Sequence, residues 1–418
     1  MNILLRSAKI IEKGSEHHGK KRDILIEKGI ITKIGNSIEL PNRCKEVSLP
    51  NLHVSAGWFD TSASLGEPGF EERENIEHGL EVAGKSGITA ILLQPNTNPH
   101  LDSKSSVEFV IGKSKGSAVS LYPIANLTQK AEGKELAELF DMSNSGARAF
   151  GDYNSPIHNV NLLKIAFQYV QNFDGIVVSY PENKELSAMG SVNESENTTR
   201  LGLNSVPTLS EELQIRRDLS MLEYTGGKLH IPTISCARSV QLIREAKRKG
   251  LDVTCSVSAH HISLTDKVLD SFDTNFKVLP PLRSSSDVKA LIKGVNDGTI
   301  DMICSDHNPI DIERKNVEFE QGDYGTIGFE SLFGALNNQL ELEIIIEQLT
   351  RGSRERFGVT YHPIKEGQIA ELSLFDPETA YEFSKEEILS KSKNSAFDGQ
   401  TLKGRAYGIY ANNELVLR

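Results

Sequence analysis

The strongest constraint on this fold is a repeated alternation of short apolar strands with amphipathic helices through the middle of the chain. Repetition of this kind places the strands parallel and joins them by helical crossovers. A closed (β/α)8 barrel is the most economical way to bury such a sheet, so we predict an α/β fold with a TIM barrel over residues 55–361. The clearest repeats are helix 76–86 before strand 87–95, helix 162–171 before strand 175–181, helix 239–250 before strand 251–259, and helix 286–298 before strand 301–306.

Both ends of the chain carry strand patterns without intervening helices. The N-terminal stretch DILIEKGIITKIG alternates apolar and polar residues and has Lys28-Gly29 where a hairpin turn belongs. The C-terminal stretch GRAYGIYANNELVLR has the same pattern around its Asn-Asn turn. We therefore predict that residues 1–54 and 362–418 form one small composite β-sandwich domain. The polar segment 183–207 is predicted to be a loop over one face of the barrel.

Charge and composition exclude several classes of protein. A net charge of −11 argues against nucleic-acid binding, which needs a basic face. No run approaches the ~18 consecutive apolar residues of a membrane span, and the first residues lack the layout of a signal peptide. The four cysteines are scattered without a CxxC pair, which is typical of reduced, buried thiols. These observations predict a cytoplasmic protein with no membrane partner.

Polar residues follow the ends of the predicted barrel strands, where barrel active sites lie. The stretches GLEVAGKSGITAILLQPNTNP, KVLPPLRSSSDVKAL, SAHHISLTD, DGTIDMICSDHNP and YGTIGFES are together very similar to dihydroorotases of the amidohydrolase superfamily, of the class found with multifunctional pyrimidine-synthesis complexes. The resemblance runs over nearly the whole chain. It implies a metal-dependent barrel with a β-sandwich, and the reversible ring closure of carbamoyl aspartate to dihydroorotate. In that family one or two zinc ions generate a hydroxide and polarise the amide.

The metal positions of this family carry different residues here. The four positions that are histidine ligands in the family fall on Ser62, Ser64, Ser179 and Thr233, and hydroxyl groups are poor zinc ligands. The family's pair of acidic residues is reduced to Asp152, and the sequence leaves open which of the two acids it represents. The catalytic and metal-binding aspartate is retained as Asp306. We therefore predict no metal cofactor and expect Asp306 to serve as a structural hydrogen-bond acceptor.

The substrate positions of the family are changed as well. Gly66 stands where the family has an arginine that binds the substrate carboxylate. Leu279 and Ile310 replace an asparagine and a histidine, which makes the pocket more apolar. Asn96 is retained. Tyr324 and Gly325 in the YGTIG loop are further candidates for binding a substrate.

The remaining histidines offer no obvious replacement for the lost ligands. The family keeps the pair His260-His261 beside its usual ligands, so we expect a packing or hydrogen-bonding role. His307 follows Asp306 directly and should point to the opposite side of the strand, and His230 should likewise lie on the opposite face from Thr233.

Three functions are compatible with this pattern. The first, which we favour, is a catalytically inactive dihydroorotase-like protein that works through assembly, either by self-association or with aspartate carbamoyltransferase, which the resemblance implies as partner. The second is an active dihydroorotase whose metal is held by Asp152, Asp306 and a displaced histidine. The third is a ligand sensor that uses Asn96 and the loop Tyr324–Gly328 to hold a small amide or pyrimidine.

Overall fold

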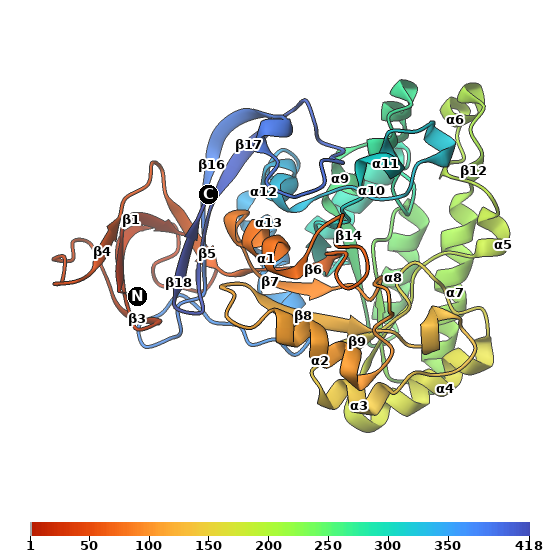
Figure 1. Ribbon diagram of the computed structural model, residues 1–418, viewed down its shortest axis with the longest axis horizontal. Coiled ribbons are helices and arrows are strands. Elements are labelled where there is room, and N and C mark those ends of the chain that lie inside the picture. Colours follow the sequence, from red (N-terminus) through yellow and green to blue (C-terminus); the bar gives the residue numbers. More distant parts are fainter. Residues whose placement is uncertain (1) are drawn as a thin grey trace.

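A computed structural model describes residues 2–418 and contains a parallel barrel as its larger part (Figure 1). All its neighbouring strands pair in parallel and follow one another in chain order, as βα repetition requires. The predicted (β/α)8 fold is therefore confirmed. The barrel strands are β6 (Trp58–Ala63), β7 (Ile88–Leu93), β8 (Ser120–Ala125), β9 (Ala149–Phe150), β10 (Ile176–Val178), β13 (Lys228–Ile231), β14 (Val253–Ser258) and β15 (Met302–Cys304).

Helices surround this barrel and pack their apolar faces against its strands (Figure 1). The helix α1 is representative: Asn75 caps its first turn, and Ile76, Leu80 and Ala83 are buried at helical spacing. The helices are α1 (Ile76–Lys85), α2 (Lys104–Lys113), α3 (Leu139–Asn144), α4 (Val160–Val170), α5 (Lys184–Ser187), α6 (Glu196–Leu201), α7 (Thr208–Thr225), α8 (Ala237–Arg248), α9 (Ala259–Ser263), α10 (Ser285–Asn296), α11 (Ile312–Lys315), α12 (Phe329–Asn337), α13 (Leu342–Leu349) and α14 (Arg351–Arg356). None of the helices in residues 2–418 is long and apolar enough to cross a membrane.

The barrel closes between its first and last strands through His307. The backbone N–H of Ser64 donates to the His307 carbonyl at 2.7 Å, and Ala63 forms a parallel bridge with His307. Closure brings the end of β15 beside the end of β6, although 244 residues separate Ser62 from Asp306 in the sequence. Residues that follow distant strands therefore meet at one mouth.

The second sheet combines strands from both ends of the chain, as expected (Figure 1). Its order is β18-β17-β16-β5-β1-β2-β3, and β4 pairs with β1. The hairpin turns predicted at Lys28-Gly29 and at Asn412-Asn413 are present. The domain boundaries at residues 54/55 and 361/362 stay a prediction. The strands are β1 (Ile3–Ile10), β2 (Lys21–Glu27), β3 (Ile30–Gly35), β4 (Lys45–Val47), β5 (His53–Ala56), β16 (Leu372–Phe383), β17 (Gln400–Ala411) and β18 (Glu414–Leu417).

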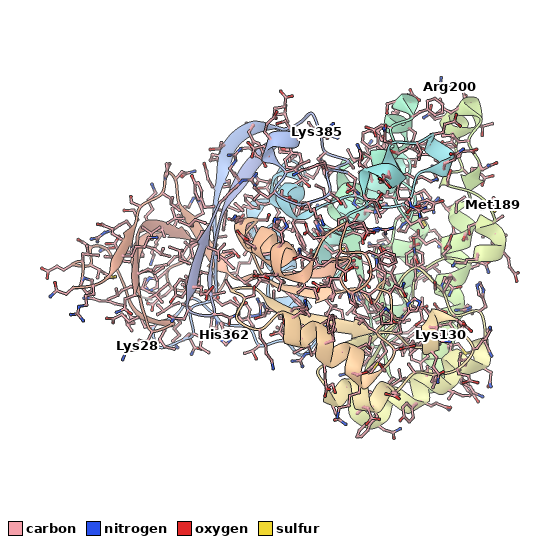
Figure 2. All side chains as sticks on the ribbon, viewed as in Figure 1. Lys28, Lys130, Met189, Arg200, His362 and Lys385 are labelled. Atoms are coloured by element: carbon pink, nitrogen blue, oxygen red, sulfur yellow. The ribbon has the colours of Figure 1, made fainter. Side chains whose placement is uncertain are left out.

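The polar segment 183–207 is not the loop that we predicted. It contains α5, α6 and a small parallel sheet of β11 (Val192–Asn193) and β12 (Ser205–Val206). A capping box between Ser195 and Thr198 starts α6, and polar residues of this kind form short capped elements as readily as loops. Figure 2 shows the side chain of Met189 projecting from the outer edge of this segment.

Candidate active site at the barrel mouth

The predicted site residues lie after the carboxyl ends of the barrel strands, but only some of them meet. Ser62, Thr233, Asp306, Tyr324 and Gly325 line one cavity at the barrel mouth. Four others lie outside that cavity, each held by hydrogen bonds to other parts of the chain; they are Ser64, Asn96, Asp152 and Ser179.

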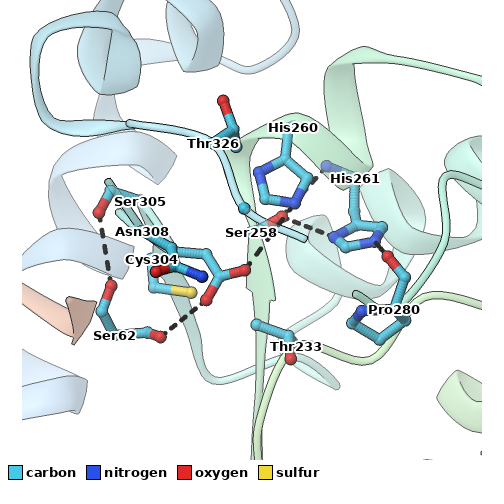
Figure 3. Close-up of polar contacts among 12 residues, drawn as sticks. Ser62, Thr233, Ser258, His260, His261, Pro280, Cys304, Ser305, Asn308 and Thr326 are labelled. Carbon is cyan, nitrogen blue, oxygen red and sulfur yellow. Dashed lines mark hydrogen bonds and ion pairs between the residues drawn. The ribbon is translucent and has the colours of Figure 1, made fainter. Parts of the chain in front are cut away.

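A hydrogen-bonded chain occupies the centre of the mouth. The Ser62 hydroxyl donates to Oδ1 of Asp306 at 2.9 Å and accepts from the Gln94 amide at 3.1 Å. Burial, together with the nearby carboxyl of Asp60, raises the pKa of Asp306 to about 7, against the opposing effect of the Ser62 hydrogen bond. The Nε2 atom of His260 lies 3.9 Å from Oδ2 of Asp306, on the other side of the carboxyl group (Figure 3). Burial holds the pKa of His260 well below its usual value, so its ring is uncharged.

Asp60 anchors the last barrel strand to the first. Its carboxyl accepts from the backbone N–H of Ser305 at 2.9 Å and from the Ser305 hydroxyl. Burial raises the pKa of Asp60 to about 6, against the lowering effect of these hydrogen bonds. Asp306, which directly follows Ser305, has a φ of +51°, a left-handed conformation that is uncommon outside glycine. The anchor at Ser305 helps to fix this strained residue at the mouth.

Ser64 and Ser179 donate to partners that hold them away from the cavity. The Ser64 hydroxyl donates to the side-chain oxygen of Asn96 at 2.9 Å, so the retained asparagine is bonded to a residue of its own chain. The Ser179 hydroxyl donates at 2.6 Å to Asp218 on α7. Asp218, which is buried, also pairs at 2.7 Å with Arg217, whose side chain is partly exposed.

Asp152 serves as a structural acceptor for the end of the neighbouring strand. Its Oδ1 accepts from the backbone N–H groups of Leu127 and Thr128 at 2.9 and 3.0 Å, and its Oδ2 accepts from the Thr128 hydroxyl. Burial nevertheless raises its pKa. Because backbone donors surround this carboxyl group, both of its oxygens are occupied by the protein itself.

Zinc does not fit the residues at this mouth. Within residues 2–418, no group of three or more histidine, cysteine or acidic side chains is arranged to hold a metal ion. The nearest approach to a donor set is Asp306 with His260, which supplies two groups where zinc usually has three or four protein ligands. Four hydroxyl residues at the positions of the family's histidines add no further strong ligand.

The cavity at the mouth has a volume of about 30 Å³. This is close to the space of a single water molecule, whereas sites for small ligands usually span ~300–1,000 Å³. Tyr153, Tyr180 and Leu279 fill much of the mouth, and burial raises the pKa of both tyrosine hydroxyls. Sequence reasoning missed both tyrosines as space-filling groups, although each follows a predicted strand end. It also placed Ile310 in this pocket, whereas Ile310 lies outside the cavity lining.

The other histidines face away from the mouth cavity. His307 accepts from the Gly328 backbone N–H at 3.1 Å and stacks on Phe329 with ring centroids 3.8 Å apart. His230 lies 3.0 Å from the Thr254 hydroxyl. Burial lowers the pKa of His230 and of His307 to about 3. His261 contacts the Pro280 carbonyl at 2.8 Å. These contacts are packing and hydrogen-bonding contacts, as expected from the sequence.

Comparisons with known proteins agree with this architecture. The family model Dihydro-orotase-like matches residues 53–239. The chain is 38% identical to a dihydroorotase of Ruminiclostridium cellulolyticum, over 92% of this chain and 91% of that protein. It is 35% identical to a dihydroorotase of Acetivibrio thermocellus, over 100% and 99%. An L-hydantoinase (dihydropyrimidinase) from Arthrobacter aurescens superposes with a TM-score of 0.85 at 20% identity, covering 100% of this chain and 96% of that one.

The strand topology and the structural superposition define an amidohydrolase-type barrel with a sheet domain built from both chain ends. Full-length identity above 30% narrows this class further. The chain belongs to the dihydroorotase family, which serves pyrimidine synthesis.

Proposed function

We propose that this chain is a catalytically inactive member of the dihydroorotase family that serves as an assembly partner of aspartate carbamoyltransferase. The observation that carries the proposal is the hydrogen bonding of the mouth. Ser62, Ser64 and Ser179 each donate to an acceptor within the chain, and Asp152 is surrounded by donors of its own protein. Family chemistry requires a metal-bound hydroxide, and this mouth offers no set of ligands to hold the ion.

The backbone at Gly66 supports the loss of substrate binding. Gly66 has a φ of +69°, and a Cβ atom there would lie 2.4 Å from the carbonyl oxygen of Phe70. An arginine therefore cannot be restored at this position without moving the turn. With Gly66 at this position and Leu279 in the cavity wall, the chain lacks the arginine side chain with which the family binds its substrate carboxylate.

The small cavity also argues against a ligand sensor at this mouth. A volume of about 30 Å³ leaves no room for carbamoyl aspartate or dihydroorotate. Thermal unfolding of the purified protein tests this directly, and we expect the same melting temperature with and without either compound. A saturable rise in melting temperature with either one would instead favour the sensor.

Metal analysis and an activity assay test the loss of catalysis. Protein purified and then incubated with zinc or cobalt should contain no stoichiometric metal after desalting, and it should form no dihydroorotate from carbamoyl aspartate. Bound metal with turnover would overturn the proposal and favour a site rebuilt around Asp306 and His260, which lie 3.9 Å apart.

A separate experiment tests the partner. The protein should co-sediment with the aspartate carbamoyltransferase of the same organism as one complex of fixed stoichiometry. Bovine serum albumin serves as the control for nonspecific association. Independent sedimentation of the two proteins at micromolar concentrations would contradict the assembly role, whatever the outcome of the metal analysis.

A further inference from the structure

The first fifty residues carry a charge opposite to that of the rest of the chain. They contain ten lysine and arginine residues and six acidic residues, which gives a net charge of +4. The other 368 residues contain 36 basic and 51 acidic residues, which gives a net charge of −15. The positive part forms β1 to β4, at the opposite end of the molecule from α5 and α6 (Figure 1). We call residues 2–50 the basic lobe.

Three of the six acidic side chains in the basic lobe are occupied by contacts within the chain. Glu12 is buried and accepts a hydrogen bond from the Tyr361 hydroxyl. Asp23 is buried and pairs at 2.7 Å with Arg6, which also pairs with Glu46. The charge that faces solvent is therefore more positive than the residue count of the lobe indicates.

The other nine basic side chains of the lobe form no ion pair with any residue of the described chain, residues 2–418. Two of them, Lys20 and Arg22, donate to backbone carbonyl groups at 2.8 Å, and these carbonyls carry no full charge to neutralise them. The nine are Lys9, Lys13, Lys20, Lys21, Arg22, Lys28, Lys33, Arg43 and Lys45.

Three of these lysines share one face of the sheet. Lys9 on β1 lies directly opposite Lys21 on β2, and Leu25 on β2 lies opposite Lys33 on β3. Lys21 and Leu25 are four residues apart on one strand, so all these side chains point to the same side. Leu25 lies outside the main apolar core of the sheet domain, so this side is the outer face. Like charges directly opposite one another destabilise a sheet, and an acidic partner would neutralise this repulsion.

We propose that the outer face of the basic lobe binds a compact acidic surface on a folded partner protein. Resting on the proposed function, we assign aspartate carbamoyltransferase as that partner. The separation of charge along the chain orients the approach, because an acidic surface is attracted by the lobe and repelled by the rest of the molecule. The lobe therefore selects which end of this chain meets the partner.

Two other kinds of polyanion fit the lobe less well. The first fifty residues contain no phenylalanine, tyrosine or tryptophan, so they offer no ring to stack on the bases of a single-stranded nucleic acid or to enter a bilayer interface. The net charge of −15 on the rest of the chain would also repel a long nucleic acid or an extended anionic membrane. A compact acidic surface avoids this repulsion because it contacts the lobe alone.

Association kinetics of the full chain with aspartate carbamoyltransferase of the same organism test this inference. The wild-type association rate should fall between ~0.01 M and ~0.15 M salt, as the screening length shortens from ~30 Å to ~8 Å. The triple variant Lys9→Glu, Lys21→Glu, Lys33→Glu should associate at least ~10-fold more slowly at the lower salt concentration, because reversal of these charges removes the attraction.

A second triple variant controls for net charge. Lys115→Glu, Lys267→Glu, Lys289→Glu changes the charge of the chain by the same amount, and these three lysines are exposed residues of the barrel without an ion pair. This variant should keep the wild-type association rate. Urea denaturation checks the fold of the basic-lobe variant, whose free energy of unfolding should stay close to wild type because the new glutamates leave one like-charge pair between β1 and β2 as before.

Each outcome bears on a different statement. Equal association rates for wild type and the basic-lobe variant would overturn this inference alone. No association of the wild type with aspartate carbamoyltransferase would overturn the proposed function as well. Poly(U) RNA and phosphatidylglycerol vesicles are the probes for the other polyanions, and we expect the wild type to bind neither. Binding to either probe that is lost in the basic-lobe variant would assign the lobe to another class of partner and overturn the inference.

Discussion

The hydroxyl of Ser62 donates a 2.9 Å hydrogen bond to the carboxyl of Asp306, across the seam that closes the barrel. In the dihydroorotase family these two positions are both ligands of the metal. Here a direct hydrogen bond links the two side chains. The change converts an open coordination site into part of the structure that holds the first and last strands together.

Removal of this hydroxyl should destabilise the fold. Ser62→Ala leaves the buried Asp306 carboxyl without its donor and the Gln94 amide without its acceptor. We expect the free energy of unfolding to fall by ~1–3 kcal/mol, measured by urea denaturation. Ser86→Ala is the control, because the Ser86 hydroxyl is buried without a hydrogen-bond partner and its removal should cost little. Equal losses in the two variants would contradict a specific role for Ser62.

The titration of Asp306 should make stability depend on pH in a predictable direction. Its folded pKa of about 7 lies above the ordinary value of 3.8, so the folded state binds more protons between these values. The contribution is therefore present at low pH and is lost as pH rises through 7. Asp306→Asn should remove this loss, and the difference in unfolding free energy between the variant and wild type should grow from pH 5 to pH 8, by roughly 3 kcal/mol at most.

The unfolding free energies of wild type and Asp306→Asn must be compared at each pH, because the buried histidines change stability with pH in the opposite direction. The lowered pKa values of His230 and His307 make stability rise with pH up to about 6.5 in wild type and variant alike. Their effects cancel in the difference between the two proteins. A constant difference from pH 5 to pH 8 would show that Asp306 is ionised throughout.

Backbone strain at Thr233 gives a third prediction. Thr233 has a φ of +45°, which is strongly disfavoured for a β-branched residue and is readily adopted by glycine. Thr233→Gly should therefore raise the free energy of unfolding by about 1 kcal/mol, as measured by urea denaturation. Thr61→Gly, at a buried position of β6 without positive φ, should lower it. A lower free energy of unfolding in Thr233→Gly would mean that the contacts of the threonine side chain stabilise the fold by more than its backbone strain destabilises it.

Periodicity and strand-end chemistry predict much of this site. The carboxyl ends of the barrel strands lie on one side of the barrel, so the sequence alone is enough to expect Ser62, Thr233 and Asp306 at its mouth. The sequence does not show which groups are hydrogen-bond partners. Ser179 bonds to Asp218 because α7 packs behind its strand, and this contact has no signature in the pattern around either residue.

Side-chain packing is equally hidden in the sequence. Tyr153 and Tyr180 close the mouth because their rings turn inward, and sequence position alone does not fix that direction. The polarity of the segment 183–207 predicts a loop, yet local capping and tertiary contacts give it regular elements. Polarity indicates exposure more reliably than it indicates the absence of helices and strands.

The buried arginine Arg283 should hold the segment 183–207 in place. One of its terminal nitrogens, Nη1, donates to the Asn193 side chain at 3.0 Å and to the Val206 carbonyl at 2.9 Å, while Nε donates to the Ser235 hydroxyl at 3.0 Å. Glu211 lies 3.8 Å away and supplies the opposite charge. A lysine cannot form this set of fixed contacts, because it presents a single nitrogen at the end of a flexible chain.

We therefore expect Arg283→Lys to loosen this segment while the barrel stays folded. Amide hydrogen exchange in residues 190–206 should speed up by at least ~10-fold, which corresponds to ~1.4 kcal/mol of local stability. Arg200→Lys is the matched control, because Arg200 lies in the same segment and forms only exposed contacts with Asn197 and Asp270. If exchange in this segment were unchanged in Arg283→Lys, the small sheet of β11 and β12 would have to be held by its own pairing. If exchange rose across the whole barrel, Arg283 would instead stabilise the entire fold.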